Sequence, residues 1–110
     1  MYGTIMRARI KKGEKDDFVA LLRRQVPTAE DYGQGLHSFE LAWEDADPDR
    51  VLIVVHFRDK QSYLANANRA ETDEQFREQQ KHFDGDAEWI DLNFAEYVGK
   101  PLTEAVSSQA

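Results

Sequence analysis

The feature that most constrains this chain is a short apolar run between an acidic turn and the start of a helix. Residues 51–55 read Val-Leu-Ile-Val-Val and follow an acidic turn at residues 45–49, Asp-Ala-Asp-Pro-Asp. An apolar run bounded by turn residues predicts a strand buried on both faces, which we place at residues 51–57. Asp59 follows at once and predicts a helix N-cap, because its carboxylate can accept an otherwise unpaired amide proton. The fold must therefore cover both faces of one strand.

The other elements follow from alternation, helical spacing and helix breakers. The expected elements, in order, are a strand at 2–10, a helix at 14–26, a strand at 36–44, the strand at 51–57, a helix from 59 that loosens over 66–70 and restarts near 72, and a strand at 88–98. Pro27 ends the first helix, and residues 72–75, Thr-Asp-Glu-Gln, fit a capping box at the restart. The order β-α-β-β-α-β predicts an α+β fold of the ferredoxin-like type, a four-stranded antiparallel sheet with helices on one face.

Helices on one face leave the other face of this sheet uncovered within one subunit. Leu52 and Val54 of the strand at 51–57 point to that second face. A domain of this size buries only about two-thirds of the surface that its unfolded chain exposes. We therefore expect a homodimer that packs this face against a second copy. Residues 1–99 would form the domain, and residues 100–110 a C-terminal tail that is mobile or reaches a partner.

The composition excludes several classes of function. The formal net charge is −7, and the cationic residues are scattered among carboxylates, which argues against a nucleic-acid partner. The chain has no cysteine, so disulfides, thiolate catalysis and cysteine-ligated metals are excluded. We expect no metal site, because the histidines lack ligand spacing and His37 and His56 should point to opposite sheet faces. No apolar stretch approaches the ~20 residues of a membrane helix, so we expect a cytoplasmic protein with no membrane contact.

Several short segments resemble one known family. They are Lys12-Gly13 before the first helix, residues 35–41 (GLHSFEL), residues 47–50 (DPDR) and residues 57–59 (FRD). Together they resemble the antibiotic-biosynthesis-monooxygenase-like family of dimeric α/β-barrel proteins over about residues 2–98. The resemblance implies a dimeric α/β barrel. It also implies one of the family's activities, among which are cofactor-free oxygenation of aromatic substrates and haem degradation.

The haem-degrading branch of this family does not match at its functional positions. The three positions that hold its Asn, Trp and iron-ligating His are aligned here with Met6, Asn66 and Gln80. A thioether and two amides cannot replace an axial imidazole and its distal partners. His82 lies near the last position, but about half a helical turn away, so it should face elsewhere. We therefore expect no haem and no other cofactor.

A pocket between the sheet and the helices would collect aromatic and polar side chains. The candidate catalytic residues are His37, Tyr63 and Asn66, and the candidate ligand-binding residues are Met6, Phe39, Trp43, Phe57 and Arg69. His37 could accept a proton near neutral pH, while Tyr63 and Asn66 could hydrogen-bond to a developing oxyanion. Alternatively, the aromatic residues fill the core and His37 is a hydrogen-bonded core histidine. Arg69 would belong to a polar rim or to a solvated loop.

The sequence leaves two alternative functions open. The first is a cofactor-independent monooxygenase that acts on a small aromatic or quinol-type molecule within a homodimer. The alternative is a non-catalytic ligand-binding or structural homodimer of the same fold. An open cavity with polar groups favours the enzyme, and a cavity filled by Phe57, Trp43 and Met6 favours the alternative. On the opposite face, Glu40 and His56 would form an acid–base pair or a hydrogen bond that sets the dimer register.

Overall fold

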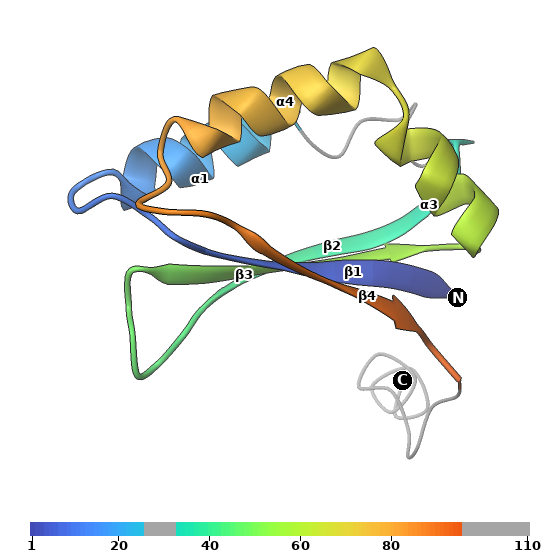
Figure 1. Ribbon diagram of the computed structural model, residues 1–110, viewed down its shortest axis with the longest axis horizontal. Helices are drawn as coiled ribbons and strands as arrows, with labels where there is room; N and C mark the ends of the chain where they lie inside the picture. Colours follow the sequence, from blue (N-terminus) through green and yellow to red (C-terminus); the bar gives the residue numbers. More distant parts are fainter. Residues whose placement is uncertain (26–32, 96–110) are drawn as a thin grey trace, which may run out of the picture.

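The computed structural model describes residues 1–25 and 33–95, and these form an antiparallel sheet with helices on one face (Figure 1). The elements are β1 (Tyr2–Arg9), α1 (Lys15–Gln25), β2 (Leu36–Trp43), β3 (Arg50–Phe57), α3 (Lys60–Ala67), α4 (Ala70–Gln80) and β4 (Glu88–Asn93). The four strands lie in the order β2-β3-β1-β4. This confirms the ferredoxin-like plan, with the second expected helix divided into α3 and α4.

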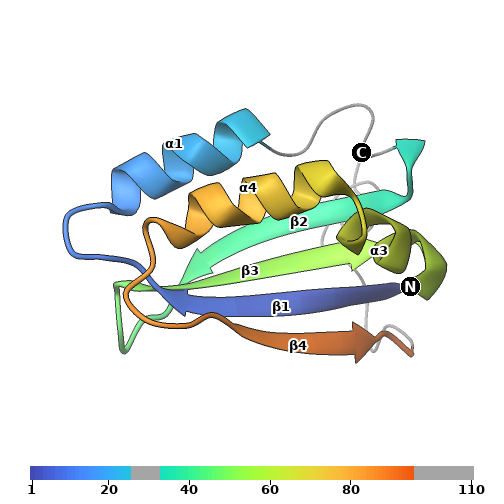
Figure 2. The same ribbon diagram turned by 45° about the horizontal axis from the view of Figure 1, so that its top comes forward.

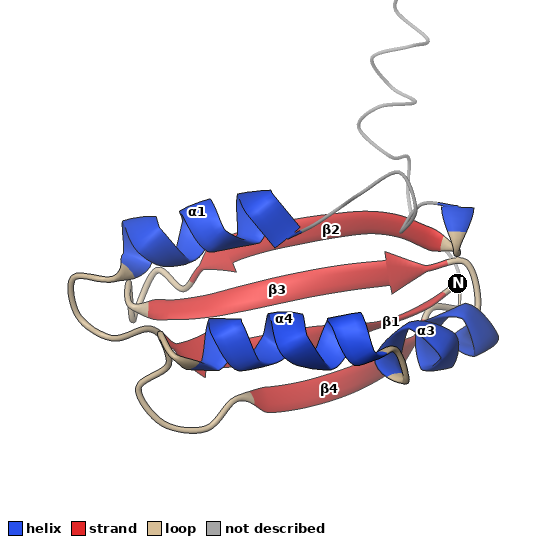
Figure 3. Cartoon of the chain, turned by 90° about the horizontal axis from the view of Figure 1, so that it is seen from above, coloured by secondary structure: helices blue, strands red, loops and turns tan. Residues whose placement is uncertain are grey.

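The helices form a single layer over the sheet. Seen from above, α1 and α4 run along the strands while α3 covers one end of the sheet (Figures 2 and 3). Gln25 at the end of α1 joins these helices, because its side-chain amide donates to the Gln75 carbonyl at 3.2 Å and accepts from Gln79 Nε2 at 3.0 Å. No described helix is long and apolar enough to cross a membrane.

The core lies under α1 and the end of α4. Phe18, Met6, Ile10 and Val51 are its largest fully buried side chains. Phe18 of α1 packs against Phe83, with ring centroids 6.0 Å apart. The alternation expected for the first strand is therefore confirmed, since its even-numbered residues face the helices and build this core.

The N-cap expected from the sequence is confirmed for α3 but not for α4. Asp59 caps α3, and its Oδ1 accepts the Ser62 amide proton at 2.7 Å. That backbone hydrogen bond also holds the pKa of Asp59 below its usual value. In contrast, α4 begins at Ala70 after an N-cap at Arg69 whose side chain makes no cap hydrogen bond. The capping box expected from Thr72 is wrong, because Thr72 already lies inside the first turn.

Several expected boundaries also differ. The first strand ends at Arg9, and Ile10 forms an isolated bridge with Phe83. The last strand ends at Asn93 rather than continuing to residue 98. Most of the expected connector after the first helix and the expected tail at 100–110 lie outside the described residues.

A β-bulge near the start of β2 changes which face its first residues occupy. Leu36 pairs with Phe57 and Ser38 pairs with His56, so His37 is an extra residue opposite His56. The His37 ring lies 6.5 Å from the His56 ring between centroids. The two histidines therefore lie together on the face away from the helices, and the expectation that they point to opposite faces is wrong.

That open face carries ion pairs at one end and exposed apolar surface elsewhere. Next to the β2–β3 hairpin, Arg7 makes a two-fold hydrogen bond to Glu44, at 2.8 and 2.9 Å, and Arg9 binds Asp47. The hydrogen bond from Arg7 is the main reason why the pKa of Glu44 lies below its usual value. Further along the same face Ile90, which pairs with Ile5, is 51% exposed. The face thus holds apolar surface that the described residues leave uncovered.

We predict that Phe18→Ala lowers the free energy of unfolding by about 3–5 kcal/mol, because it removes a fully buried ring and leaves a cavity. Urea denaturation followed by circular dichroism measures this loss. The control is Arg24→Ala on the exposed side of α1, which should change the same quantity by less than about 0.5 kcal/mol. A loss below about 1 kcal/mol for Phe18→Ala would contradict this description of the core.

Candidate functional site

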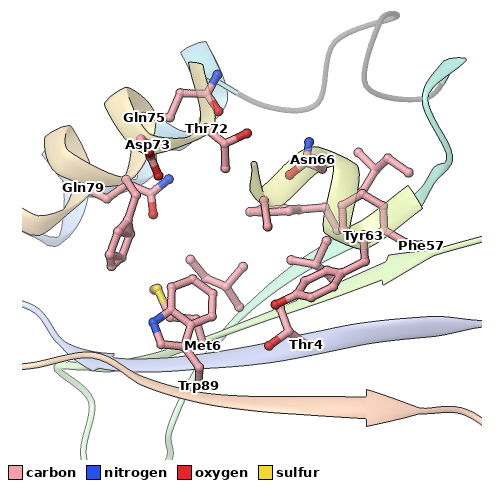
Figure 4. Close-up of a pocket in the computed structure, with 16 residues that line it drawn as sticks. Thr4, Met6, Phe57, Tyr63, Asn66, Thr72, Asp73, Gln75, Gln79 and Trp89 are labelled. Carbon is pink, nitrogen blue, oxygen red and sulfur yellow. The ribbon is translucent and has the colours of Figure 1, made fainter. Parts of the chain in front are cut away.

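A cavity of about 300 Å³ lies between the sheet and the helices α3 and α4 (Figure 4). Its apolar lining residues are Met6, Leu36, Phe39, Ile53, Val55, Phe57, Ala67, Phe76 and Trp89. Its polar lining residues are Thr4, Tyr63, Asn66, Thr72, Asp73, Gln75 and Gln79. The apolar side chains come mainly from the strands and the polar ones mainly from the helices. A ligand would therefore contact apolar surface on the sheet side and polar groups on the helix side. This is the usual composition of a small-molecule pocket.

The structure brings together five of the eight residues predicted from the sequence. Tyr63, Asn66, Met6, Phe39 and Phe57 all line the cavity. The aromatic residues do not fill it, although Phe57 and Tyr63 pack edge to face with ring centroids 5.6 Å apart. Whether these five residues act in binding or catalysis stays a prediction.

His37 does not line the cavity, and its expected place there is wrong. The β-bulge moves it to the opposite sheet face, where it is exposed and lies near His56. Its Nδ1 is 3.4 Å from the hydroxyl of the neighbouring Ser38. A base acting inside this pocket therefore cannot be the His37 imidazole in this conformation.

Trp43 and Arg69 also lie outside the cavity. Trp43 pairs with Val51 at the far end of β2, where Lys15 Nζ sits 4.3 Å from the centre of its ring. Arg69 occupies the N-cap of α4, and its Nε lies 3.6 Å from Glu71 Oε2. Trp43 lies too far from the cavity along β2 to contact a ligand there. Arg69 precedes the turn of α4 that faces the cavity.

Sequence reasoning missed several lining residues. Thr4 shares a strand face with Met6, so the alternation of β1 already carried that signal. The capping-box pattern predicts that Thr72 and Gln75 lie at the start of a helix, whereas both lie inside α4. Trp89 follows the alternation of β4 and packs edge to face on Phe76, with centroids 5.3 Å apart.

The pKa of Tyr63, which lines the site, is raised above its usual value. Its hydroxyl donates to Asp91 Oδ1 at 3.0 Å, and its ring lies 5.2 Å from the Tyr2 ring between centroids. Burial raises the pKa of Tyr63, and the hydrogen bond to Asp91 and the negative charge of that carboxylate raise it further. A hydrogen bond with Thr4 acts in the opposite direction, and the net change in the pKa is upward. The Tyr63 phenol is therefore neutral at physiological pH.

The described residues give the cavity little charge and no metal-binding cluster. No group of three or more His, Cys, Asp or Glu side chains in this part of the chain could hold a metal ion. Asp73 is the one charged residue among those that line the cavity, and no histidine is among them. His82 lies elsewhere, with its Nδ1 2.9 Å from Glu14 Oε1. The site suits a mainly apolar ligand without negative charge.

We predict that the Tyr63 phenol ionises above its ordinary pKa of 10.0, because burial and Asp91 both disfavour the phenolate. The folded protein holds this proton more tightly than the unfolded chain does. The stabilisation is thus complete below pH 10.0 and is lost as the pH rises through the raised pKa.

Absorbance titration of the wild type minus that of Tyr63→Phe measures this pKa. Asp91→Asn should lower it, since the carboxylate charge is removed. A difference curve with its midpoint at or below the ordinary value would show that Tyr63 is solvated.

Comparisons with known proteins agree with this architecture. A family model described as "Antibiotic biosynthesis monooxygenase" matches residues 1–79. No curated protein matches the chain. Among solved structures, 58 chains match.

Three of these structures illustrate the likeness. A crystal structure of an antibiotic biosynthesis monooxygenase is 14% identical with a TM-score of 0.70, covering 87% of this chain and 100% of that one. A conserved protein from Methanosarcina mazei Go1 is 14% identical with a TM-score of 0.70, covering 83% and 89%. A protein from Mycobacterium tuberculosis is 10% identical with a TM-score of 0.72, covering 89% and 98%.

At these identities the solved structures show a shared fold, whereas the family model covers most of the chain itself. The chain belongs to the antibiotic biosynthesis monooxygenase family.

Proposed function

We propose that the protein is a cofactor-independent monooxygenase that acts on a small aromatic or quinol-type molecule. The observation that carries this proposal is the open cavity, which has aromatic and aliphatic walls and hydrogen-bonding groups on the helix side. Such a cavity can hold a flat apolar molecule and orient its oxygen atoms. Family membership supports the same class of reaction.

In this reaction the substrate itself supplies the electrons that reduce oxygen. A phenol loses its hydroxyl proton, and the ring carbon para to the oxygen forms a bond to dioxygen. The O–O bond then breaks, that carbon loses its proton, and a second carbonyl forms. One oxygen atom enters the quinone product and the other leaves as water with the two protons, so no external reductant is needed.

The chain's own residues would bind and orient the substrate. The Asn66 amide lines the cavity and can donate a hydrogen bond to a substrate oxygen. The Tyr63 hydroxyl donates to Asp91, so its oxygen can accept a hydrogen bond from a substrate hydroxyl. Phe39 and Phe57 offer apolar surface to the rings and help to exclude water. The proton-accepting role expected for His37 is not part of this proposal, because His37 lies on the opposite face.

The second candidate is a ligand-binding homodimer without catalysis. The observation that favours it is that no histidine is found among the described lining residues. The same pocket would then bind its ligand without turnover. Oxygen consumption separates the two candidates, whereas ligand-dependent thermal stabilisation is expected of both.

We predict that the protein consumes oxygen with one- or two-ring phenols such as 1-naphthol. Asn66→Ala should lower kcat/KM by about tenfold or more, because it removes a hydrogen bond to developing negative charge. His37→Ala should retain wild-type kcat/KM, since this exposed side chain lies outside the cavity.

An oxygen electrode with quinone detection by absorbance measures the reaction. Thermal stabilisation by the same phenols without oxygen uptake would support the binding protein instead. A loss of turnover in a folded His37→Ala protein would overturn the assignment of this pocket.

We also propose that the protein is a homodimer formed through the open sheet face. Ile90 and Val54 expose apolar surface there, and the His56 ring stacks on Phe94 with centroids 4.5 Å apart. The Nδ1 atom of His56 is buried without a hydrogen-bond partner among the described residues. A second copy would cover the apolar surface, and its polar groups would provide a partner for this atom.

We predict that multi-angle light scattering gives the mass of two chains at micromolar concentration. Val54→Glu should shift the mass toward one chain, because it buries a carboxylate in the centre of the proposed interface. Asp86→Asn, in the exposed loop before β4, is the control and should leave the mass unchanged. A single-chain mass for the wild type would contradict the dimer.

A further inference from the structure

The direction of the hydrogen bonds made by the cavity hydroxyls carries information about the ligand. A tyrosine hydroxyl has one proton to donate, and an ionised carboxylate can only accept. The Tyr63 hydroxyl therefore donates its hydrogen bond to Asp91, at 3.0 Å, and its oxygen lone pairs can accept hydrogen bonds from other partners. In the close-up the hydroxyl end of Tyr63 turns toward Thr4 at the floor of the pocket (Figure 4).

Thr4 is arranged in the same way. Its Oγ1 donates to the backbone carbonyl of Ile90 at 3.1 Å, so its proton also points away from the cavity. Both partners come from β4, because the sheet register places Thr4 opposite Asp91. One strand thus accepts the hydrogen bonds of two neighbouring hydroxyl groups. The two hydroxyl groups also interact with each other, since a hydrogen bond with Thr4 opposes part of the rise in the pKa of Tyr63. Each oxygen has two lone pairs, so each can still accept a hydrogen bond on the wall of the same pocket.

The protonation state of Tyr63 makes this arrangement persistent. Burial and Asp91 both raise the pKa of Tyr63, so the phenol keeps its proton across the physiological range. The remaining ionisable group on the wall, Asp73, is also an acceptor when ionised. A ligand group that approaches Tyr63 and Thr4 must consequently bring its own proton.

We propose that Tyr63 and Thr4, oriented by Asp91 and by the Ile90 carbonyl, form an acceptor site for a ligand hydroxyl. The site selects one- or two-ring phenols and quinols over their methyl ethers and quinones. The limit of one or two rings in the ligand follows from the size of the cavity. Its volume of about 300 Å³ lies at the small end of the range for ligand pockets. Asp91 is a positioning residue here, because it acts through Tyr63.

This proposal rests on the proposed function for its substrate class, and it adds a consequence for turnover. A phenol that is oxidised to a quinone loses the hydroxyl proton that the acceptor site recognises. The product then binds more weakly than the substrate at the same place. The hydrogen-bond directions would thereby favour product release.

The test is anaerobic isothermal titration calorimetry with three probes: 1-naphthol, 1-methoxynaphthalene and 1,4-naphthoquinone. The wild type should bind 1-naphthol about tenfold more tightly than either of the other two, which is the effect of one hydrogen bond. Asp91→Asn should reduce this preference to about twofold or less. An amide can donate as well as accept, so the Tyr63 hydroxyl becomes free to rotate and donate to a ligand carbonyl.

Two further variants complete the design. Tyr63→Phe should also lose the preference, because it removes the acceptor oxygen while keeping the ring. Asp86→Asn makes the same charge change in the exposed loop before β4 and should keep the wild-type preference. Circular dichroism of each variant confirms that it is folded before binding is measured.

Equal affinities of the wild type for the three probes, or no binding of any of them, would overturn the proposal. A preference that persists in folded Asp91→Asn would also overturn it, since Asp91 would then not set the hydroxyl direction. Selective anaerobic binding without oxygen uptake supports the acceptor site and counts against the oxygenase. Oxygen uptake without selective binding supports the oxygenase and counts against the acceptor site.

Discussion

The rest of the structure depends on the burial of β1 and β3 under the helix layer. Met6, Ile10 and Val51 are almost completely removed from solvent, and Phe18 of α1 closes over them. Near the β2–β3 hairpin the rings of Phe18 and Phe83 meet and close the layer. At the other end the same layer is hollow. Core and pocket are thus two halves of one interface between sheet and helices.

The division of the second helix into α3 and α4 shapes the hollow half. The chain turns at Asn68 and Arg69, so α3 lies across the end of the sheet while α4 runs along it (Figure 3). Tyr63 therefore enters the pocket from one direction and Gln75 from another. The hydrogen bonds between Gln25 and α4 hold that wall in place, as they connect it to the helix that covers the core.

The two faces of the sheet carry different side chains. The helix face provides the core and the cavity, whereas the open face has Arg–carboxylate pairs at one end. The rest of that face mixes exposed apolar side chains with the rings of His37 and His56. There the His56 ring stacks on Phe94, and its Nε2 lies 3.8 Å from Glu40 Oε1. In the proposed dimer a second copy would bury the apolar side chains while the Arg–carboxylate pairs stay partly hydrated, and their uneven distribution would favour one orientation of the pair.

The sequence by itself determined the order of the elements, the ferredoxin-like sheet, the Asp59 cap and five of the lining residues. These follow from alternation and helical spacing, which are local patterns. Only the tertiary structure decided the place of His37, because one extra residue at the bulge reverses the alternation before Ser38. It also decided that Tyr63 donates to Asp91, 28 residues away. No local pattern encodes such a contact, since it depends on how β4 pairs with β1 and where α3 rests on the sheet.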